Sequence, residues 1–244
     1  MTAKQPNSAT TAITMQPIGV IHSPYAQKFA VPRQPGLVSA ARATIALLGE
    51  AAHIDCVRGL TQFSHIWVTF VFHQTQAKGW KPLVRPPRLG GNKKVGVFAT
   101  RSTFRPNPLG LSVVELAEVR HDGERVLIDV IGGDWVNGTP VLDIKPYVPY
   151  ADTISHAQGG FAQQRPATLT TTFSAQALAQ LQALSHAYPQ LQLLIEQVLA
   201  QDPRPAYQQQ QGPAKSYGMA LYDLNIRWQV VNQQNHVISI VKDF

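Results

Sequence analysis

The sequence contains no Asp or Glu between Cys56 and Val114, a stretch that carries nine Lys or Arg. We call residues 56–114 the basic segment. Outside it, 12 Lys and Arg face 14 Asp and Glu, so the formal net charge of +7 arises entirely within this segment. Such local charge is expected where a polyanion binds, because neutralised phosphates release their counterions. Pro and Gly interleave with the cations, which favours loops of fixed shape over a solvated face.

Cysteine is also scarce, since Cys56 stands alone; this excludes an internal disulfide and disfavours a thiolate metal site. His65 and His73 cannot share a metal, because a straight strand would hold them roughly 26 Å apart. The longest apolar run, 66–72, is far shorter than the ~20 residues that a bilayer requires. The first thirteen residues lack the apolar core of a secretory signal. We therefore expect no metal, no membrane span and a cytoplasmic protein.

The signatures of the common nucleotide-binding and hydrolytic folds are missing as well. No G-x-G-x-x-G or Walker loop is present, and the nearest Gly-rich stretch, 89–93, lacks the strand-to-helix context. There is no G-x-S-x-G elbow, and Cys56 has no local signature of a nucleophile. Any nucleotide cofactor must therefore bind in a non-Rossmann way, and covalent catalysis has no support.

Residues 16–152 are predicted to be β-rich. Short segments rich in Val, Ile, Phe and Trp alternate with Gly, Pro, Asn and Asp turn signals, and no helical segment is long enough for βαβ crossovers. This pattern favours a β-barrel or sandwich over a doubly wound sheet. The predicted strands are 18–22, 43–48, 65–72, 94–99, 111–119, 125–131 and 141–146.

The chain beyond this region changes character. We expect a mobile tail at 1–15, a linker at 153–173 and a small α+β domain at 174–244, so that the whole protein is mainly β. Ser174 caps a helix with Leu178, Leu181 and Leu184 at helical spacing. Pro189 starts a second helix, whose predicted apolar side comprises Leu193, Leu194, Val198 and Leu199. Alternating strands between 217 and 241 turn at Asn232–Asn235 and close the domain.

Six ordered motifs carry a resemblance to a known family. They are IGVIHSPY (18–25), KFAVPRQPG (28–36), GLTQFSHIWVTFVFHQ (59–74), RPPRLGGN (85–92), GVFATRSTFRPNPLGLS (96–112) and NGTPVLDIKPYVPYAD (137–152). The chain resembles the TsaA-like family, typified by TrmO-type tRNA methyltransferases. The C-terminal DPRPAY (202–207) and YDLNIRWQV (222–230) are similar to the second domain of the same family.

The resemblance implies a homodimeric, S-adenosylmethionine-dependent enzyme with an unusual β-barrel. Its substrate would be the N6 of N6-threonylcarbamoyladenosine, the modified base next to the anticodon of threonine tRNA. One position departs from the family pattern, because Asn137 stands where an Asp often precedes Gly-Thr-Pro. This departure directs attention to Asp143 for any role that needs a negative charge.

Recognition of S-adenosylmethionine calls for a cation at the carboxylate, polar groups at the ribose and an apolar slot for adenine. Arg101 suits the carboxylate, because a guanidinium pairs with it in a bidentate manner. The resemblance implies the remaining cofactor residues, which are Gln27, Lys28, Phe29, His73, Gln74, Leu111, Gly138, Thr139 and Pro140.

Catalysis by such an enzyme mainly requires that donor and acceptor be held in line without water, since methyl transfer from a sulfonium is already downhill. The carbamoyl group acidifies the acceptor N–H, so a weak base suffices. Asp143, Tyr147 and His65 are the candidate base or orienting residues. The candidates for contact with tRNA phosphates are Arg85, Arg88, Lys93, Lys94, Arg105 and Lys145.

Two other classes of protein remain open on the sequence. A barrel that binds RNA without chemistry needs the basic segment but no cofactor loop. A methyltransferase with a small-molecule substrate fits the barrel motifs but leaves the positive field unexplained. Binding of S-adenosylmethionine distinguishes a methyltransferase from an RNA-binding barrel without chemistry. Methylation of bulk tRNA distinguishes a tRNA methyltransferase from one that acts on a small molecule.

Overall fold

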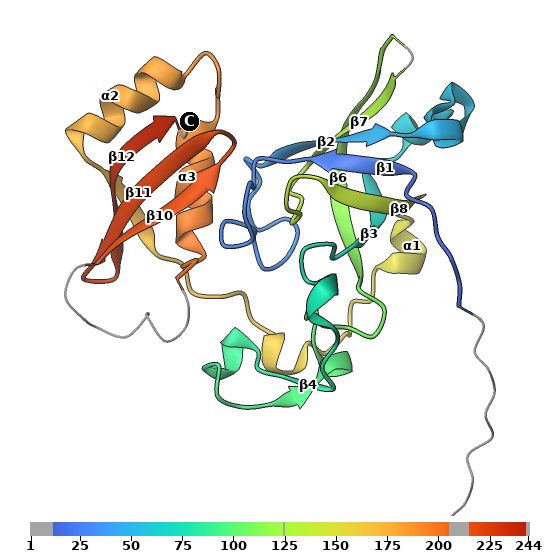
Figure 1. Ribbon diagram of the computed structural model, residues 1–244, viewed down its shortest axis with the longest axis horizontal. Coiled ribbons are helices and arrows are strands. Elements are labelled where there is room, and N and C mark those ends of the chain that lie inside the picture. Colours follow the sequence, from blue (N-terminus) through green and yellow to red (C-terminus); the bar gives the residue numbers. More distant parts are fainter. Residues whose placement is uncertain (1–11, 124, 205–214, 243–244) are drawn as a thin grey trace, which may run out of the picture.

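The computed structural model describes residues 12–123, 125–204 and 215–242. A β-barrel and a smaller α+β unit lie side by side, and the β4 segment projects below them in Figure 1. Most of the predicted tail, 1–15, lies outside the described residues. None of the described helices has the length and apolarity needed to cross a membrane.

Six antiparallel strands close the barrel in the order β1-β2-β7-β6-β3-β8, which confirms the mainly β prediction. Alternation of side chains produces the core: Ile66, Val68 and Phe70 of β3 are buried, while the residues between them face outward. Closure gives each of these strands a partner on both sides. The strands are β1 (Gly19–His22), β2 (Arg42–Leu47), β3 (His65–Val71), β6 (Leu109–Asp122), β7 (Arg125–Ile131) and β8 (Thr139–Pro146).

The strand predicted at 94–99 is wrong for most of its length. Only β5 (Val95–Gly96) pairs, with β4 (Leu83–Val84), and these two form a separate ribbon outside the barrel. Regular pairing between β4 and β5 does not continue to Pro82, the residue before β4, because proline has no N–H to donate. The carbonyl of Pro82 accepts instead from the N–H of Val97 at 3.0 Å, where a 3₁₀ turn begins.

Short helical turns occupy the loops on either side of the barrel. They hold the connections in shape through local backbone hydrogen bonds, as between the N–H of Gly90 and the carbonyl of Pro87 (3.0 Å). These elements are η1 (Gly49–Ala52), η2 (Ile54–Val57), η3 (Leu60–Gln62), η4 (Gln76–Lys78), η5 (Pro87–Leu89), η6 (Val97–Ala99), α1 (Pro149–Asp152) and η7 (Gly160–Ala162).

The C-terminal unit packs two helices against a four-stranded sheet of order β10-β11-β12-β9. The predicted cap is present, since the Ser174 hydroxyl accepts from the N–H of Ala177 at 3.0 Å. Strand β9 lies inside the range expected as a linker and pairs in parallel with β12, so the sheet begins before residue 174. The elements are β9 (Thr170–Phe173), α2 (Ala175–Leu184), α3 (Leu191–Ala200), β10 (Ser216–Leu221), β11 (Leu224–Val231) and β12 (Gln234–Lys242).

The predicted apolar faces of the two helices are confirmed at Leu181, Leu194, Val198 and Leu199, which are buried, and are wrong at one position in each helix. Leu178 of α2 is 48% exposed and Leu193 of α3 is 44% exposed, whereas Ala177 and Leu181 are buried. Residues three apart drift by about 60° around a helix, so a run of Leu at that spacing leaves the core face. The four-residue spacing from Ala177 to Leu181 defines the buried stripe instead.

The long loop between β1 and β2 joins the two units. Tyr25, Ala30 and Val38 belong to the hydrophobic core of the C-terminal unit although they precede the second barrel strand. The N–H of Tyr222 donates to the carbonyl of Pro24 at 2.7 Å, and Tyr25 forms a β-bridge with Leu221. The C-terminal unit therefore holds this loop, which contains the predicted cofactor residues 27–29, in place.

Candidate functional site

Most of the predicted cofactor residues come together at one end of the barrel. In an antiparallel barrel, the C-terminal end of each strand lies beside the N-terminal end of its neighbours. The loops after β1, β3 and β7 therefore meet the starts of β2, β6 and β8 at the same end. Residues 27–29, 73–74, 101 and 138–140 all lie in or beside these loops, although they are widely separated in the sequence.

The loop after β1 presents an aromatic ring and a cation. Phe29 is 53% exposed, and the ammonium of Lys28 lies 5.4 Å from the centre of its ring. The N–H of Ala30 donates to the carbonyl of Gln27 at 3.2 Å and closes a turn, while the buried Ala30 side chain fixes this turn on the C-terminal unit. A cavity of about 160 Å³ separates residues 28–33 from Val198, Gln201 and Pro203. This loop can therefore offer both apolar and positive surface to a ligand.

The loop after β3 and the start of β6 form a second wall. His73 and Gln74 follow β3, and the neighbouring N–H of Phe72 donates to the carbonyl of Pro108 at 2.7 Å. Leu111 points outward from β6 and is 55% exposed. Next to it, a Cβ on Gly110 would meet the Phe70 ring at 2.2 Å, so only glycine lets this ring fill the barrel mouth.

The loop before β8 contributes backbone more than side chains. Gly138 has φ of +82°, a conformation that favours glycine, and its N–H donates to the carbonyl of Ile21 at 2.8 Å. The buried Thr139 hydroxyl donates to the carbonyl of Val136 at 2.6 Å and is thus already used. Asn137 accepts from the N–H of Ser23 through its side-chain oxygen at 3.2 Å. A carboxylate at this position would accept the same bond.

Arg101 reaches the same end of the barrel from the basic segment. Its exposed guanidinium donates to the side-chain oxygen of Gln34, in the loop after β1. It also lies near Asp134 of the loop after β7, where its charge helps to lower the pKa of that carboxyl group. Arg101 therefore connects three loops of the candidate site.

Asp134 is a polar group of the site that the sequence analysis missed. Burial raises the pKa of Asp134 to about 6, against the opposing effects of the Ser112 hydrogen bond and the Arg101 charge. The Ser112 hydroxyl donates to the carboxylate at 2.6 Å from the interior side of β6. The sequence shows only an acid in a Gly-Gly-Asp-Trp turn between two apolar strands, and because Asp is a common turn residue this gave no distinctive signal.

Tyr25 lies close enough to Asp134 for the carboxylate to affect its ionisation. Burial, followed by the negative charge of Asp134, raises the pKa of the Tyr25 hydroxyl. This hydroxyl is buried and finds no hydrogen-bond partner among the residues that the structure describes. A buried hydroxyl without a partner is uncommon. The barrel end thus combines a carboxylate, a phenol and a guanidinium.

The three predicted catalytic residues lie elsewhere on the barrel. His65 starts β3, at the end opposite His73, and its Nδ1 lies 2.9 Å from the Ser64 hydroxyl. Tyr147 follows β8, and its hydroxyl is 2.8 Å from that of Thr153. Asp143 projects from the outer surface of β8 and forms an ion pair with Lys145. Within one chain, the structure does not bring this trio to the predicted cofactor residues.

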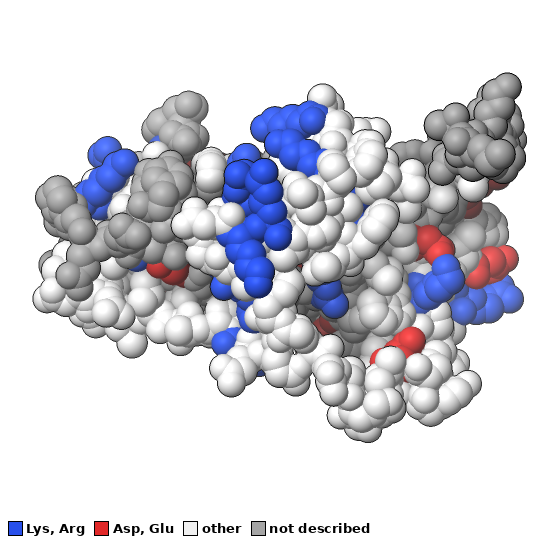
Figure 2. Space-filling view, turned by 90° about the horizontal axis from the view of Figure 1, so that it is seen from below, with Lys and Arg blue, Asp and Glu red and all other residues white. Residues whose placement is uncertain are grey.

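The predicted RNA-binding residues divide into two groups. Arg88 donates to the carbonyl of Gln164 at 2.6 Å, Arg105 donates to the carbonyl of Thr100 at 2.7 Å, and Lys145 is paired as described above. The other three, Arg85, Lys93 and Lys94, are exposed and make no hydrogen bond or ion pair with the described residues. Figure 2 shows Lys and Arg gathered in a band on the underside of the molecule, with few acidic side chains near it.

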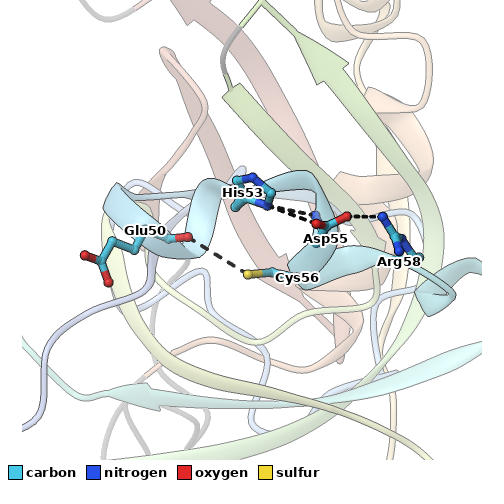
Figure 3. Close-up of polar contacts among 5 residues, drawn as sticks. All are labelled: Glu50, His53, Asp55, Cys56 and Arg58. Atoms are coloured by element: carbon cyan, nitrogen blue, oxygen red, sulfur yellow. Dashed lines mark hydrogen bonds and ion pairs between the residues drawn. The ribbon is translucent and has the colours of Figure 1, made fainter.

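Cys56 lies outside this site. Its thiol is exposed and lies 4.0 Å from the carbonyl oxygen of Glu50, while the His53 ring faces Asp55 and not the sulfur (Figure 3). Asp55 in turn pairs with Arg58. A thiol without a neighbouring base lacks the arrangement of an activated nucleophile. Across the described part of the chain, no three His, Cys, Asp or Glu residues are grouped as a metal site requires.

Comparisons with known proteins give one consistent result. The family model of the tRNA-methyltransferase O N-terminal domain matches residues 20–153, and that of the TrmO C-terminal domain matches residues 166–243. The chain is 50% identical over 231 residues to the Escherichia coli protein named tRNA (adenine(37)-N6)-methyltransferase, covering 94% of this chain and 98% of that one.

Two further relatives agree. A Pseudomonas aeruginosa protein named putative S-adenosylmethionine-dependent methyltransferase RcsF is 47% identical over 216 residues, covering 88% of this chain and 91% of the relative. The crystal structure of TrmO from Pseudomonas aeruginosa aligns with a TM-score of 0.78 at 38% identity, over 95% of this chain and 99% of that one. Both family models, the relatives and the shared fold show that this chain belongs to the TrmO family.

Proposed function

We propose that this chain methylates the N6 of N6-threonylcarbamoyladenosine next to the anticodon of threonine tRNA, with S-adenosylmethionine as the methyl donor. It is a tRNA (adenine-N6)-methyltransferase, as its family and the name of its Escherichia coli relative indicate. The observation that carries the proposal is the convergence of the cofactor candidates at one barrel end, beside a segment that holds all the excess positive charge.

The residues at this barrel end suit S-adenosylmethionine. Arg101 offers a guanidinium to a carboxylate, and the exposed side chains of Phe29 and Leu111 offer apolar surface to an adenine. The Tyr25 hydroxyl, which is buried and lacks a partner among the described residues, lies near Asp134 at this barrel end. When bound, this cofactor supplies an electrophilic methyl group on a positively charged sulfur.

We assign to Asp134 the role of accepting the proton that N6 loses in the reaction. On taking up the methyl group that S-adenosylmethionine would supply, with S-adenosylhomocysteine as the leaving group, N6 of the base would have to lose its proton. A carboxylate in the barrel mouth can accept this proton and release it to water. Since burial raises the pKa of Asp134 to about 6, the group is ionised at neutral pH and is a stronger base than an ordinary aspartate. Ser112 orients the carboxylate through its hydrogen bond.

The tRNA is expected to approach over the basic segment. Arg85, Lys93 and Lys94 are exposed and have no partner in the described part of the chain, so they can bind phosphates without breaking an existing interaction. Arg88 and Arg105 hold loop carbonyls and add charge to the same surface. Phosphate contacts position a nucleic acid, and the barrel mouth then selects the base.

We further propose a symmetric homodimer that acts in the cytoplasm, where tRNA is modified. His65 and Tyr147 lie at the barrel end opposite the predicted cofactor loops, so a catalytic role for them would be met by the cofactor site of a partner subunit. Light scattering at micromolar concentration should report twice the monomer mass. A monomer that retains full activity would refute this part of the proposal.

The function is tested by methylation of bulk tRNA with isotope-labelled S-adenosylmethionine, followed by digestion and mass spectrometry of the nucleosides. We expect the label on a single modified adenosine. The variant Lys242→Ala, whose exposed ion pair with Asp223 lies outside both the candidate site and the basic segment, should methylate as the parent does. Labelled product in a small molecule but not in RNA would refute the proposal.

A further inference from the structure

The two most exposed aromatic side chains of the basic segment lie close to the β4–β5 ribbon. Phe98 is 76% exposed and Trp80 is 54% exposed. Single exposed apolar residues are common on protein surfaces, but two large exposed rings that flank one ribbon within a basic segment call for an explanation. No role at the barrel end uses either residue.

The β4–β5 ribbon brings the two rings into one region. Leu83 pairs with Gly96, and the carbonyl of Pro82 accepts from the N–H of Val97 at 3.0 Å. The segment before β4, with Trp80, therefore runs beside the segment after β5, with Phe98. The N–H of Lys81 donates to the carbonyl of Phe104 at 3.2 Å and fixes the same arrangement further along.

The exposure of Phe98 is imposed by its backbone. Its neighbour Val97 is buried, and the carbonyl of Val97 accepts from the N–H and the hydroxyl of Thr100 at 3.1 and 2.8 Å. Arg105 donates to the carbonyl of Thr100 at 2.7 Å. A turn held at this many points presents the ring outward in a fixed position, which reduces the entropic cost when a ligand stacks on it.

A cation lies beside the Phe98 ring. The guanidinium of Arg105 lies 5.8 Å from the centre of the Phe98 ring, and the basic segment contains no acid to offset its charge. A planar apolar surface within a positive field fits an unpaired nucleotide, whose base stacks while its phosphate is neutralised. A second copy of this surface fits poorly, since an isologous contact would bring like charges together.

We propose that Phe98 and Trp80 are stacking platforms for unpaired bases of the tRNA anticodon loop. The proposal rests on the function proposed above and adds the RNA element that the basic segment selects. Stacking requires bases that are free of a duplex, so the ribbon favours a single-stranded loop over a stem. Arg85, Lys93 and Lys94 then hold the flanking phosphates.

Binding of an anticodon stem-loop RNA and of a fully paired duplex of the same composition tests the proposal. Phe98→Ala should weaken binding to the stem-loop by about 5- to 150-fold and leave the duplex unchanged. Phe98→Tyr should retain the affinity, because the ring remains. Tyr150→Ala removes a 93%-exposed ring outside the basic segment and should change nothing.

The salt dependence separates stacking from charge. Phe98→Ala should leave the slope of log affinity against log salt unchanged, whereas Lys93→Ala should flatten it by about 0.7–0.9 for each phosphate that is no longer neutralised. Trp80→Ala should behave like Phe98→Ala. A 2-aminopurine in the loop should be quenched by the parent protein and less so by either alanine variant.

Three results would overturn the proposal. The first is an unchanged stem-loop affinity of Phe98→Ala and Trp80→Ala in a protein that methylates tRNA, which leaves the enzymatic function standing. The second is an equal loss of duplex and stem-loop binding. The third is a change of oligomeric state in Phe98→Ala without loss of RNA affinity, which would assign the ring to a subunit interface. Failure of the parent protein to methylate tRNA would instead refute the proposed function.

Discussion

Replacement of Asp134 by Asn should make the protein more stable and less active at neutral pH. Asn keeps an oxygen that can accept the Ser112 hydroxyl but removes the buried negative charge. Burial is the largest cause of the raised pKa of Asp134, so the ionised form is the one that the fold disfavours. Sites that carry out chemistry commonly retain such unfavourable groups at a cost in stability.

The magnitude follows from the pKa. The pKa of Asp134 rises from 3.8 to about 6, and each unit corresponds to about 1.36 kcal/mol, so ionisation of this group costs the folded state about 3 kcal/mol above pH 6. Well below pH 3.8 both states bind the proton and the cost vanishes. Between these values the unfolded chain binds fewer protons than the folded one, so the stability of the parent protein falls as pH rises. The advantage of Asp134→Asn should grow over the same interval.

Urea unfolding of both proteins at several pH values between about 4 and 8 measures this difference. We expect nearly equal free energies of unfolding at the acidic end and a gain of up to about 3 kcal/mol for the variant at neutral pH, or about 6–12 °C in melting temperature. Methylation by Asp134→Asn should fall by about 10²- to 10⁴-fold, and the parent rate should decline below about pH 6. A variant that is equally stable at all pH values, or fully active, would refute the reasoning.

Three further changes test other parts of the site. Arg101→Ala should weaken S-adenosylmethionine binding by about 10- to 150-fold in calorimetry, since it removes a charge-assisted contact of ~1.5–3 kcal/mol, while the fold persists because the side chain is exposed. Lys93→Ala combined with Lys94→Ala should flatten the salt dependence of tRNA binding by nearly one unit for each phosphate that is no longer neutralised, and should leave cofactor affinity unchanged. Gly110→Ala should destabilise the barrel by about 1–3 kcal/mol in urea unfolding, because the new Cβ would overlap the Phe70 ring.

Each of these changes has a control. Arg58→Ala removes an exposed guanidinium outside the site and should bind the cofactor normally. Lys242→Ala removes a cation outside the basic segment, 3.8 Å from Asp223, and should keep the parent salt slope. Normal cofactor affinity of Arg101→Ala would remove that residue from the site. An unchanged slope in the double lysine variant would make the basic segment an ordinary solvated surface. Equal stability of Gly110→Ala and the parent would mean that the Phe70 ring can move aside.

The barrel was predictable because each strand has a residue pattern of its own that indicates a strand. Alternation on β3 specifies which face is buried, and turn residues mark the strand ends. The same reasoning fails at 94–99, where the sequence looks like a strand but the pairing stops after two residues. Whether a short segment forms a strand depends on the segment with which it pairs. The residues of the segment alone do not show where that pairing begins and ends.

The site was predictable only in part, for a related reason. Arg101 could be chosen from its charge and its loop context, but its neighbour Gln34 lies 67 positions earlier in the chain. Asp134 went unnoticed because its raised pKa arises from burial, and its partner Ser112 lies 22 positions away. Asp143 and His65 were chosen as titratable residues within motifs; Asp143 pairs with Lys145 on β8 and His65 starts β3, and their catalytic roles stay predictions.

The central claim is tested most directly by comparing two preparations of threonine tRNA that differ only in the threonylcarbamoyl group of the adenosine beside the anticodon. Each is incubated with the protein and methyl-labelled S-adenosylmethionine, digested, and analysed by nucleoside mass spectrometry. We predict one labelled methyl group on N6 of N6-threonylcarbamoyladenosine in the modified tRNA and no label in the unmodified one. Equal labelling of both tRNAs, or label at any other nucleoside, would contradict the account.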